Sequence, residues 1–150
     1  MSTWPIMAAM SQNVDKLRKQ YEAFNRRDWE TAAELLDPDV ELHGTVGGLE
    51  EDVVVRGPDG IRQQFEIEDD EVWEEHRIEP EKFIDAGEQV VVIQREYQRA
   101  KGSGVEIEGN TATVFDMRDG RIVRMQGYMD PAAALKAVGL SETLADLRPR

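Results

Sequence analysis

Three consecutive β-strands joined by short turns are predicted between residues 88 and 130, and this stretch constrains the fold more than any other. The β-branched runs at 90–93 and 105–107 are typical of strands. KGSG (101–104) and DG (119–120) are typical of the turns between them. Because strands joined by short turns pair in opposite directions, the sequence predicts an antiparallel meander around which the other segments pack.

The DG turn admits two loops, and the loop decides which residues of the last two strands share a face. A two-residue loop pairs Arg118 with Arg121, whereas a three-residue loop with a glycine bulge pairs Thr113 with Met125. We favour the three-residue loop because it sets apolar residues opposite apolar residues. On this register, alternate residues of both strands form the concave face of the sheet.

The chain carries a large excess of acidic side chains. Its 150 residues include 18 basic and 31 acidic ones, which gives a net charge of −13. This charge repels phosphate backbones and anionic lipid, so we expect no nucleic-acid partner and no membrane partner. The absence of cysteine excludes disulfides, a thiol nucleophile and thiolate metal sites. No apolar run approaches the roughly 18 residues of a membrane span, and we expect a cytoplasmic protein.

Two helices are predicted before the first strand. Apolar residues spaced three and four apart indicate an amphipathic helix over 11–27, and a shorter helix capped by Asp28 follows. The strand DVELH (39–43) comes next. Strand alternation turns Leu42 inward and His43 outward.

A third helix is predicted to start at GPDG (57–60), since proline is tolerated in a first helical turn. Its apolar face includes Phe65 and Trp73. In EIEDDEVWEE (66–75) seven of ten residues are acidic, which indicates a solvated outer face. His76 is predicted to end this helix in a structural role, where a cation suits the helix dipole.

Three further segments complete the chain. The stretch 77–85 reads as a strand, and its Pro80 suits an edge or a bulge. The glycine-containing connection 44–56 holds an apolar run at 53–55 that is either an edge strand or a flap. A short helix is predicted over 131–138.

This order of elements predicts an α+β fold. Three helices from the N-terminal half cover one side of a curved antiparallel sheet, giving a cone with an apolar hollow, and a short C-terminal helix follows. We divide the chain into a flexible start (1–10), one cone domain (11–140) and a C-terminal tail (141–150).

Four segments carry a resemblance to a known family: residues 21–42 (YEAFNRRDWETAAELLDPDVEL), 57–65 (GPDGIRQQF), 83–92 (FIDAGEQVVV) and 114–140. In these segments the chain resembles the nuclear transport factor 2-like superfamily, and within it the SnoaL-like branch related to ketosteroid isomerases and limonene epoxide hydrolases. The resemblance implies a cone-shaped fold and a homodimer formed through the sheet. It leaves the activity open, because isomerases, cyclases, hydrolases, dehydratases and proteins without catalysis share this shape.

The resemblance places the catalytic groups of both enzyme families at positions that hold other residues here. Leu42 stands where ketosteroid isomerases have a general base, and Thr113 stands near their oxyanion-stabilising acid. Arg95 matches the arginine of limonene epoxide hydrolases, but Tyr97 and Gly127 stand at their two carboxylates. Neither mechanism is therefore expected in this chain.

Arg95 is the main candidate for ligand recognition in the predicted hollow. A buried guanidinium needs a partner, and its planar fork suits a carboxylate or carbonyl of a ligand. The alternatives are an internal acid, an acid of a partner chain, or a register that turns Arg95 outward. The residues predicted to line the pocket are Tyr21, Leu42, Trp73, Arg95, Tyr97, Thr111, Thr113, Phe115, Met125, Gly127 and Met129.

Two functions of different classes fit these features. The first is a pocket protein that binds an apolar small molecule bearing a carbonyl or carboxylate, with a cyclase, isomerase or lyase step as the reaction class. The second is a homodimeric structural or interaction module with a filled cone, pairing through a convex face that carries Gln94, Glu96 and Gln98. His43 and His76 form no metal-ligand spacing, and we expect no cofactor.

Overall fold

The computed structural model describes the backbone of residues 4–140 and the side chains of residues 12–140. Residues 1–3 and the predicted tail 141–150 lie outside this part of the chain. The helices and strands, in chain order, are α1 (Trp4–Asn25), α2 (Trp29–Ala33), β1 (Leu36–Val46), β2 (Val54–Arg56), α3 (Pro58–Glu71), β3 (Trp73–Ala86), β4 (Gln89–Ala100), β5 (Glu106–Arg118), β6 (Arg121–Tyr128) and α4 (Pro131–Ala137).

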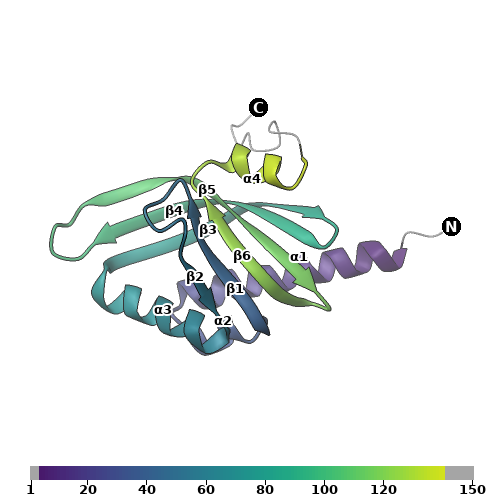
Figure 1. Ribbon diagram of the computed structural model, residues 1–150, viewed down its shortest axis with the longest axis horizontal. Coiled ribbons are helices and arrows are strands. Elements are labelled where there is room, and N and C mark those ends of the chain that lie inside the picture. Colours follow the sequence, from purple (N-terminus) through teal and green to yellow (C-terminus); the bar gives the residue numbers. More distant parts are fainter. Residues whose placement is uncertain (1–3, 141–150) are drawn as a thin grey trace.

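The strands form one curved six-stranded sheet in the order β2-β1-β6-β5-β4-β3, and the α+β prediction is confirmed (Figure 1). Strands β3 to β6 make the predicted antiparallel meander. Strand β1 pairs in parallel with β6, so the sheet is mixed rather than purely antiparallel. The 44–56 connection supplies the edge strand β2, one of the two predicted alternatives.

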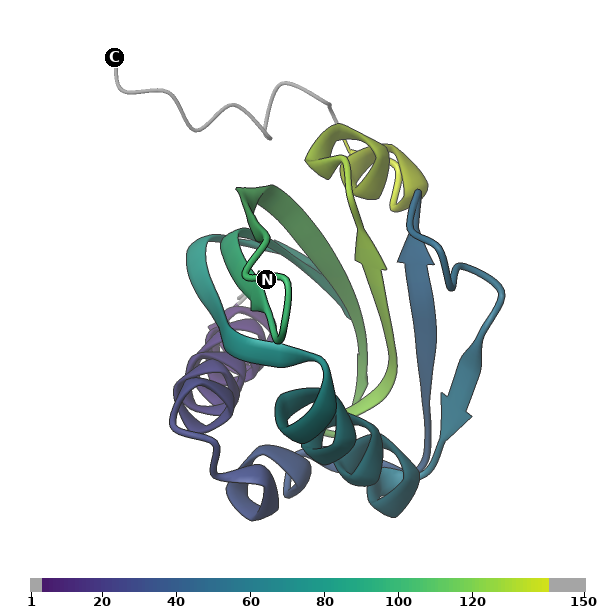
Figure 2. The same cartoon turned by 90° about the vertical axis from the view of Figure 1, so that its left-hand side faces the viewer.

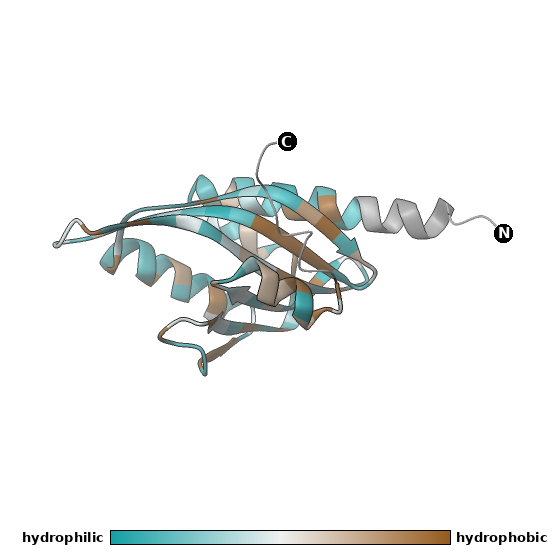
Figure 3. Cartoon of the chain, turned by 90° about the horizontal axis from the view of Figure 1, so that it is seen from above, coloured by the Kyte–Doolittle hydropathy of each residue, from teal (hydrophilic) through white to brown (hydrophobic). Residues whose placement is uncertain are grey.

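Helices α1, α2 and α3 cover the concave side of the sheet, and α4 lies on the opposite side (Figures 1 and 2). Each side has its own apolar cluster. The concave cluster includes Leu17, Ile61 and Phe115. The outer cluster packs Val91 and Ile93 of β4 against α4. Seen from above, the strands are hydrophobic beside α4 and hydrophilic toward their far ends (Figure 3).

Local sequence signals explain where the helices begin. Asp28 caps α2 by accepting a hydrogen bond from the backbone N–H of Thr31, and Pro58 occupies the first turn of α3. Helix α1 begins at Trp4, earlier than the predicted helix over 11–27. Pro80 lies on the edge strand β3 beside a register shift, as predicted.

The predicted third helix is too long by one turn. Helix α3 ends at Glu71, and strand β3 begins at Trp73. Val72 and Trp73 favour a strand, and the backbone N–H of Lys101 donates to the carbonyl of Val72, which joins this point to the sheet. Trp73 and His76 are therefore strand residues, and the prediction that His76 ends a helix is wrong.

The preferred loop at the DG turn is also wrong, although its consequence for the faces holds near the cavity. Arg118 pairs with Arg121 around a two-residue turn, as in the rejected alternative. A bulge beyond the turn then shifts the register by one residue, so that Thr113 stands opposite Gly127. Beyond the bulge Phe115, Met125 and Gly127 keep their predicted concave side, because the bulge restores the parity of the pairing. Between the turn and the bulge the prediction is wrong, since Ile122 instead of Val123 lies on the concave side, beside Met117.

The register between β4 and β5 overturns the predicted faces of β4. Arg99 pairs with Glu106, which leaves six residues between the partners. An even number of intervening residues puts even-numbered residues of β4 beside odd-numbered residues of β5, and Gln94 stands opposite Thr111. Arg95 and Tyr97 therefore lie on the outer face, where the sequence analysis had placed Gln94, Glu96 and Gln98.

Candidate functional site

A cavity of about 620 Å³ lies between the concave face of the sheet and helices α1 to α3. This volume falls within the usual range for small-molecule sites, so the alternative of a filled cone does not hold. The walls are mainly apolar, and their large apolar side chains are Phe24, Trp29, Leu36, Leu42, Val55, Ile61, Phe65, Trp73, Ile78, Phe115 and Met125.

Nine of the eleven residues predicted to line the pocket lie at this cavity, namely Tyr21, Leu42, Trp73, Thr111, Thr113, Phe115, Met125, Gly127 and Met129. The predictions for Arg95 and Tyr97 are wrong. The Arg95 side chain is 48% exposed, and its Nε lies 2.9 Å from Oε1 of Glu108. The Tyr97 hydroxyl donates to Glu106 at 3.0 Å. The register that turns Arg95 outward was among the open alternatives.

A buried glutamine organises the polar part of the cavity wall. Gln94 is 3% exposed, and its Oε1 accepts a hydrogen bond from the Tyr21 hydroxyl at 2.5 Å. Its Nε2 donates to Oγ1 of Thr111 and to Oγ1 of Thr113, each at 3.1 Å. Burial raises the pKa of the Tyr21 phenol well above its ordinary value, so this hydroxyl stays neutral and acts as a donor.

The network continues from Thr111 to a histidine–carboxylate pair. The Thr111 hydroxyl donates to Oε2 of Glu96 at 2.9 Å. Oε1 of Glu96 lies 2.9 Å from Nε2 of His76 and accepts a weaker bond from Gln98 at 3.3 Å. His76 is only 9% exposed and packs edge-on against the ring of Phe24.

Three adjacent strands bring these groups together. His76 of β3 stands directly opposite Gln98 of β4, and Glu96 stands opposite Gly109 of β5. Because residues two apart on a strand share a face, His76, Glu96 and Thr111 all point into the cone. The absence of a side chain at Gly109 leaves the space beside Glu96 open to the cavity.

A hydrogen bond joins the His76 imidazole to the Glu96 carboxylate at the cavity wall. With Nε2 protonated, the imidazole donates to Glu96, and Nδ1 takes part in none of these bonds. A neutral imidazole held in this way accepts a proton at its second nitrogen, and the neighbouring carboxylate stabilises the imidazolium that forms. Nε2 of Gln98 lies 3.4 Å from the same His76 nitrogen, but the shorter contact with the Glu96 carboxylate, at 2.9 Å, favours the tautomer with the hydrogen on Nε2.

The cavity wall offers little positive charge. Among its described residues, Arg62 is the one lysine or arginine. Its guanidinium is engaged by Glu66 at 3.2 Å and by Asp59 at 3.7 Å. In the described side chains, no group of three or more histidine, aspartate or glutamate residues is arranged to hold a metal ion.

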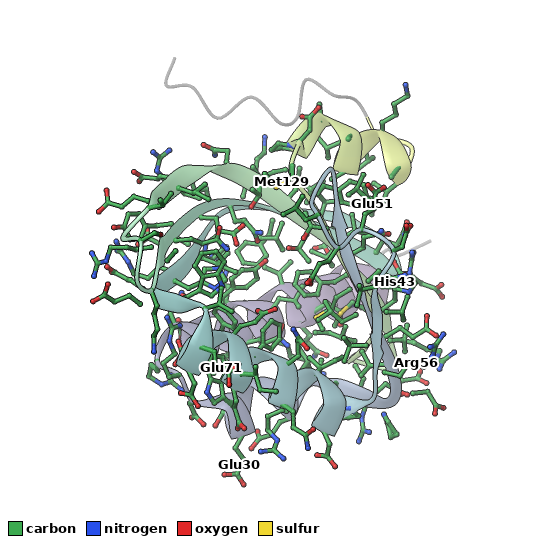
Figure 4. The ribbon with its side chains drawn as sticks, turned by 60° about the vertical axis from the view of Figure 1, so that its left-hand side comes forward. Glu30, His43, Glu51, Arg56, Glu71 and Met129 are labelled. Carbon is green, nitrogen blue, oxygen red and sulfur yellow. The ribbon has the colours of Figure 1, made fainter. Side chains whose placement is uncertain are left out.

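Apolar side chains surround the mouth of the cavity. Leu49 in the loop between β1 and β2 is fully exposed, and Val53, Ile107 and Met129 are about half exposed. Figure 4 looks at the molecule from the side of this loop, with Met129 and His43 near it and Arg56 pointing away. His43 borders the cavity as well, and its Nε2 lies 2.9 Å from Oε1 of Glu41.

Sequence reasoning missed His76, Glu96 and Gln94 as cavity residues. For His76 the missing signal is the alternation in WEEHRIEP, where His76 and Ile78 occupy alternate positions of a strand. The acidic run before it favoured a helix instead. For Gln94 and Glu96 the sequence alone gave no register.

The chain matches known proteins in family and in fold. The family model described as SnoaL-like domain matches residues 17–125. No curated protein matches the chain. No helix in residues 4–140 combines the length and the apolar character that a membrane crossing requires.

Solved structures share the fold over most of the chain. An NTF2-like protein of unknown function from Burkholderia pseudomallei K96243 is 27% identical, with a TM-score of 0.70 over 85% of this chain and 98% of that chain. TerC, co-crystallised with polyporic acid, is also 27% identical, with a TM-score of 0.69 and the same coverage of 85% and 98%. A putative SnoaL-like polyketide cyclase from Shewanella denitrificans OS-217 shares the fold at 17% identity, with a TM-score of 0.64 over 79% of this chain and 90% of that chain.

Proposed function

We propose, from the premise that this chain belongs to the family of SnoaL-like domains, that its cone binds an apolar small molecule bearing a carbonyl group and that His76 and Glu96 transfer a proton to or from it. The observation that carries the proposal is a buried histidine, hydrogen-bonded to a partly buried carboxylate, at the wall of a cavity of about 620 Å³ with mainly apolar walls. Such a combination of a hydrophobic pocket and a few convergent polar groups is typical of enzyme sites.

The chemistry follows from the order of the hydrogen bonds. A proton on the carbon next to a carbonyl passes to Nδ1 of His76, and the electron pair that it leaves forms an enolate, whose negative charge is balanced by the imidazolium formed in the same step. The imidazolium is stabilised by the Glu96 carboxylate 2.9 Å from Nε2. Return of the proton to a different carbon of the ligand completes an isomerisation. In a ring closure the enolate carbon bonds to a second carbonyl carbon of the ligand, whose oxygen takes the proton, and in an elimination the bond to a β-oxygen breaks and that oxygen leaves with the proton.

The names of the neighbours agree with this reaction class. One solved neighbour is called a putative polyketide cyclase, and TerC was crystallised with polyporic acid. The prediction of a carboxylate ligand is no longer supported, because Arg95, its expected partner, lies outside the cavity. A homodimer formed through the outer face of the sheet remains a proposal, which sedimentation velocity of the full chain tests.

Proton exchange tests the proposed reaction directly. We expect the protein to accelerate exchange of the α-protons of 2-tetralone in D₂O, followed by NMR. The exchange rate with the His76→Gln variant should be about 100-fold lower than with the wild type, which is the scale of general acid–base catalysis. The Arg95→Ala variant is the matched control and should keep the wild-type rate, since its side chain lies on the outer face. Equal rates for wild type and His76→Gln would overturn the catalytic role of His76.

Binding is measured separately from catalysis. Isothermal titration with 2-tetralone and with polyporic acid reports occupancy of the cone in both variants. We expect saturable binding that is retained in His76→Gln. Failure of every such ligand to bind would overturn the pocket function itself.

A further inference from the structure

The hydrogen-bond donors of Tyr21, Gln94, Thr111 and Thr113 on the cavity wall are all engaged, whereas acceptor sites remain beside them. Both hydrogens of the Gln94 amide are donated, one to Thr111 and one to Thr113. The single hydrogen of the Tyr21 phenol goes to Gln94, and the Thr111 hydroxyl hydrogen goes to Glu96. The Thr113 hydroxyl donates to Oε1 of Gln94 at 3.4 Å. A ligand that approaches this wall therefore finds no hydrogen-bond donor from these side chains without breaking an existing bond.

The acceptors are not used up in the same way. A carboxylate has about four lone-pair sites. The Glu96 side chain receives one bond at Oε2, from Thr111, and two at Oε1, from His76 and Gln98. One site on Oε2 remains, on a side chain that is 21% exposed and lines the cavity. Nδ1 of His76 is a second acceptor when the ring is neutral.

The charges around Oε2 of Glu96 also favour a neutral hydrogen-bond donor as the ligand group. Arg62 is the one lysine or arginine among the described cavity-lining residues, and it is engaged by acids of its own helix. A ligand carboxylate placed beside Glu96 would meet a like charge in a site with restricted water, without a counter-ion. A neutral hydroxyl would donate a charge-assisted hydrogen bond to the same oxygen.

We infer that the cone selects ligands that present a hydrogen-bond donor, a phenol or enol hydroxyl, to Oε2 of Glu96, and that it rejects carboxylates. The inference rests on the proposed function and narrows it to neutral carbonyl compounds whose enol form carries such a hydroxyl. A phenol is the stable analogue of that enol. Glu96 thereby sets specificity, in addition to orienting His76.

A matched series of naphthalenes tests this selection by isothermal titration. The three probes are 2-naphthol, 2-methoxynaphthalene and 2-naphthoate, which share the ring and differ in the polar group. We expect 2-naphthol to bind at least about tenfold more tightly than 2-methoxynaphthalene, which lacks the donor. We expect 2-naphthoate to bind most weakly of the three. Equal affinities for naphthol and naphthoate, or for naphthol and its methyl ether, would overturn the inference.

The Glu96→Gln variant locates the effect. An amide at this position carries no charge and can donate, so the preference for naphthol should shrink and naphthoate should gain affinity. Glu106→Gln, on the outer face beside Tyr97, is the control and should keep the wild-type ranking. An unchanged ranking in Glu96→Gln would exclude Glu96 as the selecting group.

The outcomes separate this inference from the proposed function. Binding of naphthoate as tightly as naphthol overturns the donor selection while the pocket function stands. Failure of all three naphthalenes and of 2-tetralone overturns both. The ranking measured on the wild-type protein decides the inference even where the Glu96→Gln variant does not fold.

Discussion

The two faces of strand β4 carry similar kinds of side chain and use them differently. On the inner face, Gln94 and Glu96 belong to one continuous hydrogen-bond network that is largely buried. On the outer face, Arg95 and Tyr97 form separate pairs with acids of β5, in contact with solvent. Because buried polar groups are costly to leave unpaired and exposed pairs contribute little, only the inner set is expected to control stability and binding.

The largest effect is expected from Gln94→Leu, which breaks the centre of the inner network. The substitution removes the acceptor of the Tyr21 hydroxyl and the donor to two threonines. We expect the free energy of unfolding to fall by about 3 kcal/mol, the scale for buried polar groups left without partners. Urea denaturation measures it.

The control for that variant is Gln126→Leu, at the outer face of β6. Gln126 stands opposite Val114 of the outer cluster and accepts a hydrogen bond from Arg124. We expect its unfolding midpoint to stay close to that of the wild type. Equal losses in the two variants would mean that the inner network has no special weight.

Tyr21→Phe is expected to have an intermediate effect. It removes one hydrogen bond and keeps the edge-on ring contacts with Phe83 and Phe115. The expected loss at neutral pH is about 1 kcal/mol. Because burial raises the folded-state pKa of the Tyr21 phenol, wild-type stability should fall as the pH rises above the ordinary tyrosine value of about 10.

The phenylalanine variant has no such group to titrate. The stability difference between wild type and variant should therefore narrow in alkali, as measured by urea denaturation between neutral and alkaline pH. A difference that widens with rising pH would contradict the buried, neutral state of Tyr21.

Asp85→Asn is expected to stabilise the protein. Within the described side chains, Oδ1 of Asp85 is buried without a hydrogen-bond partner, and burial raises the pKa of this carboxyl. A raised folded-state pKa means that wild-type stability falls as the pH rises from the ordinary carboxyl value through the raised one. We expect the variant to gain less than about 1 kcal/mol at neutral pH, because the carboxyl is only partly buried and its charge is screened by solvent.

The pH series again supplies the check for Asp85. The gain from asparagine should vanish in acid, where the carboxyl of the wild type is protonated in both the folded and unfolded states. Thermal unfolding across the acidic range measures it. A gain that is independent of pH would assign the effect to something other than the charge of Asp85.

The sequence predicted the two faces of β5 and β6 correctly near the cavity, but not the two faces of β4. Local signals gave the meander, the caps and the concave set on β5 and β6, since Phe115 and Met125 alternate with polar neighbours. Which residues of β4 face the cavity depends on whether the number of residues between the paired Arg99 and Glu106 is even or odd. The residues KGSG indicate a turn, but they do not determine how many residues the turn contains.

The sequence did not predict the candidate site, for two reasons: the register between β4 and β5 was unknown, and the end of the third helix was placed too late. Reversing β4 moved Glu96 outward in the prediction, and extending the third helix moved His76 to a helix end. Each residue was therefore judged alone, although only their approach to 2.9 Å makes a chemical site. Contacts between strands that are distant in sequence carry this information, and residue types do not.

The smallest effect is expected from Arg95→Ala, and it completes the comparison of the faces. The Arg95 guanidinium is half exposed and paired with Glu108, and exposed pairs of this kind contribute less than about 1 kcal/mol. The ion pair is also screened by salt, so the small loss should shrink further at high ionic strength. Affinity for 2-tetralone should not change, because Arg95 lies across the sheet from the cavity. Urea denaturation at low and high salt measures the first effect and isothermal titration the second. A loss of ligand affinity in this variant would mean that Arg95 contacts the ligand, and it would contradict the assignment of Arg95 to the outer face.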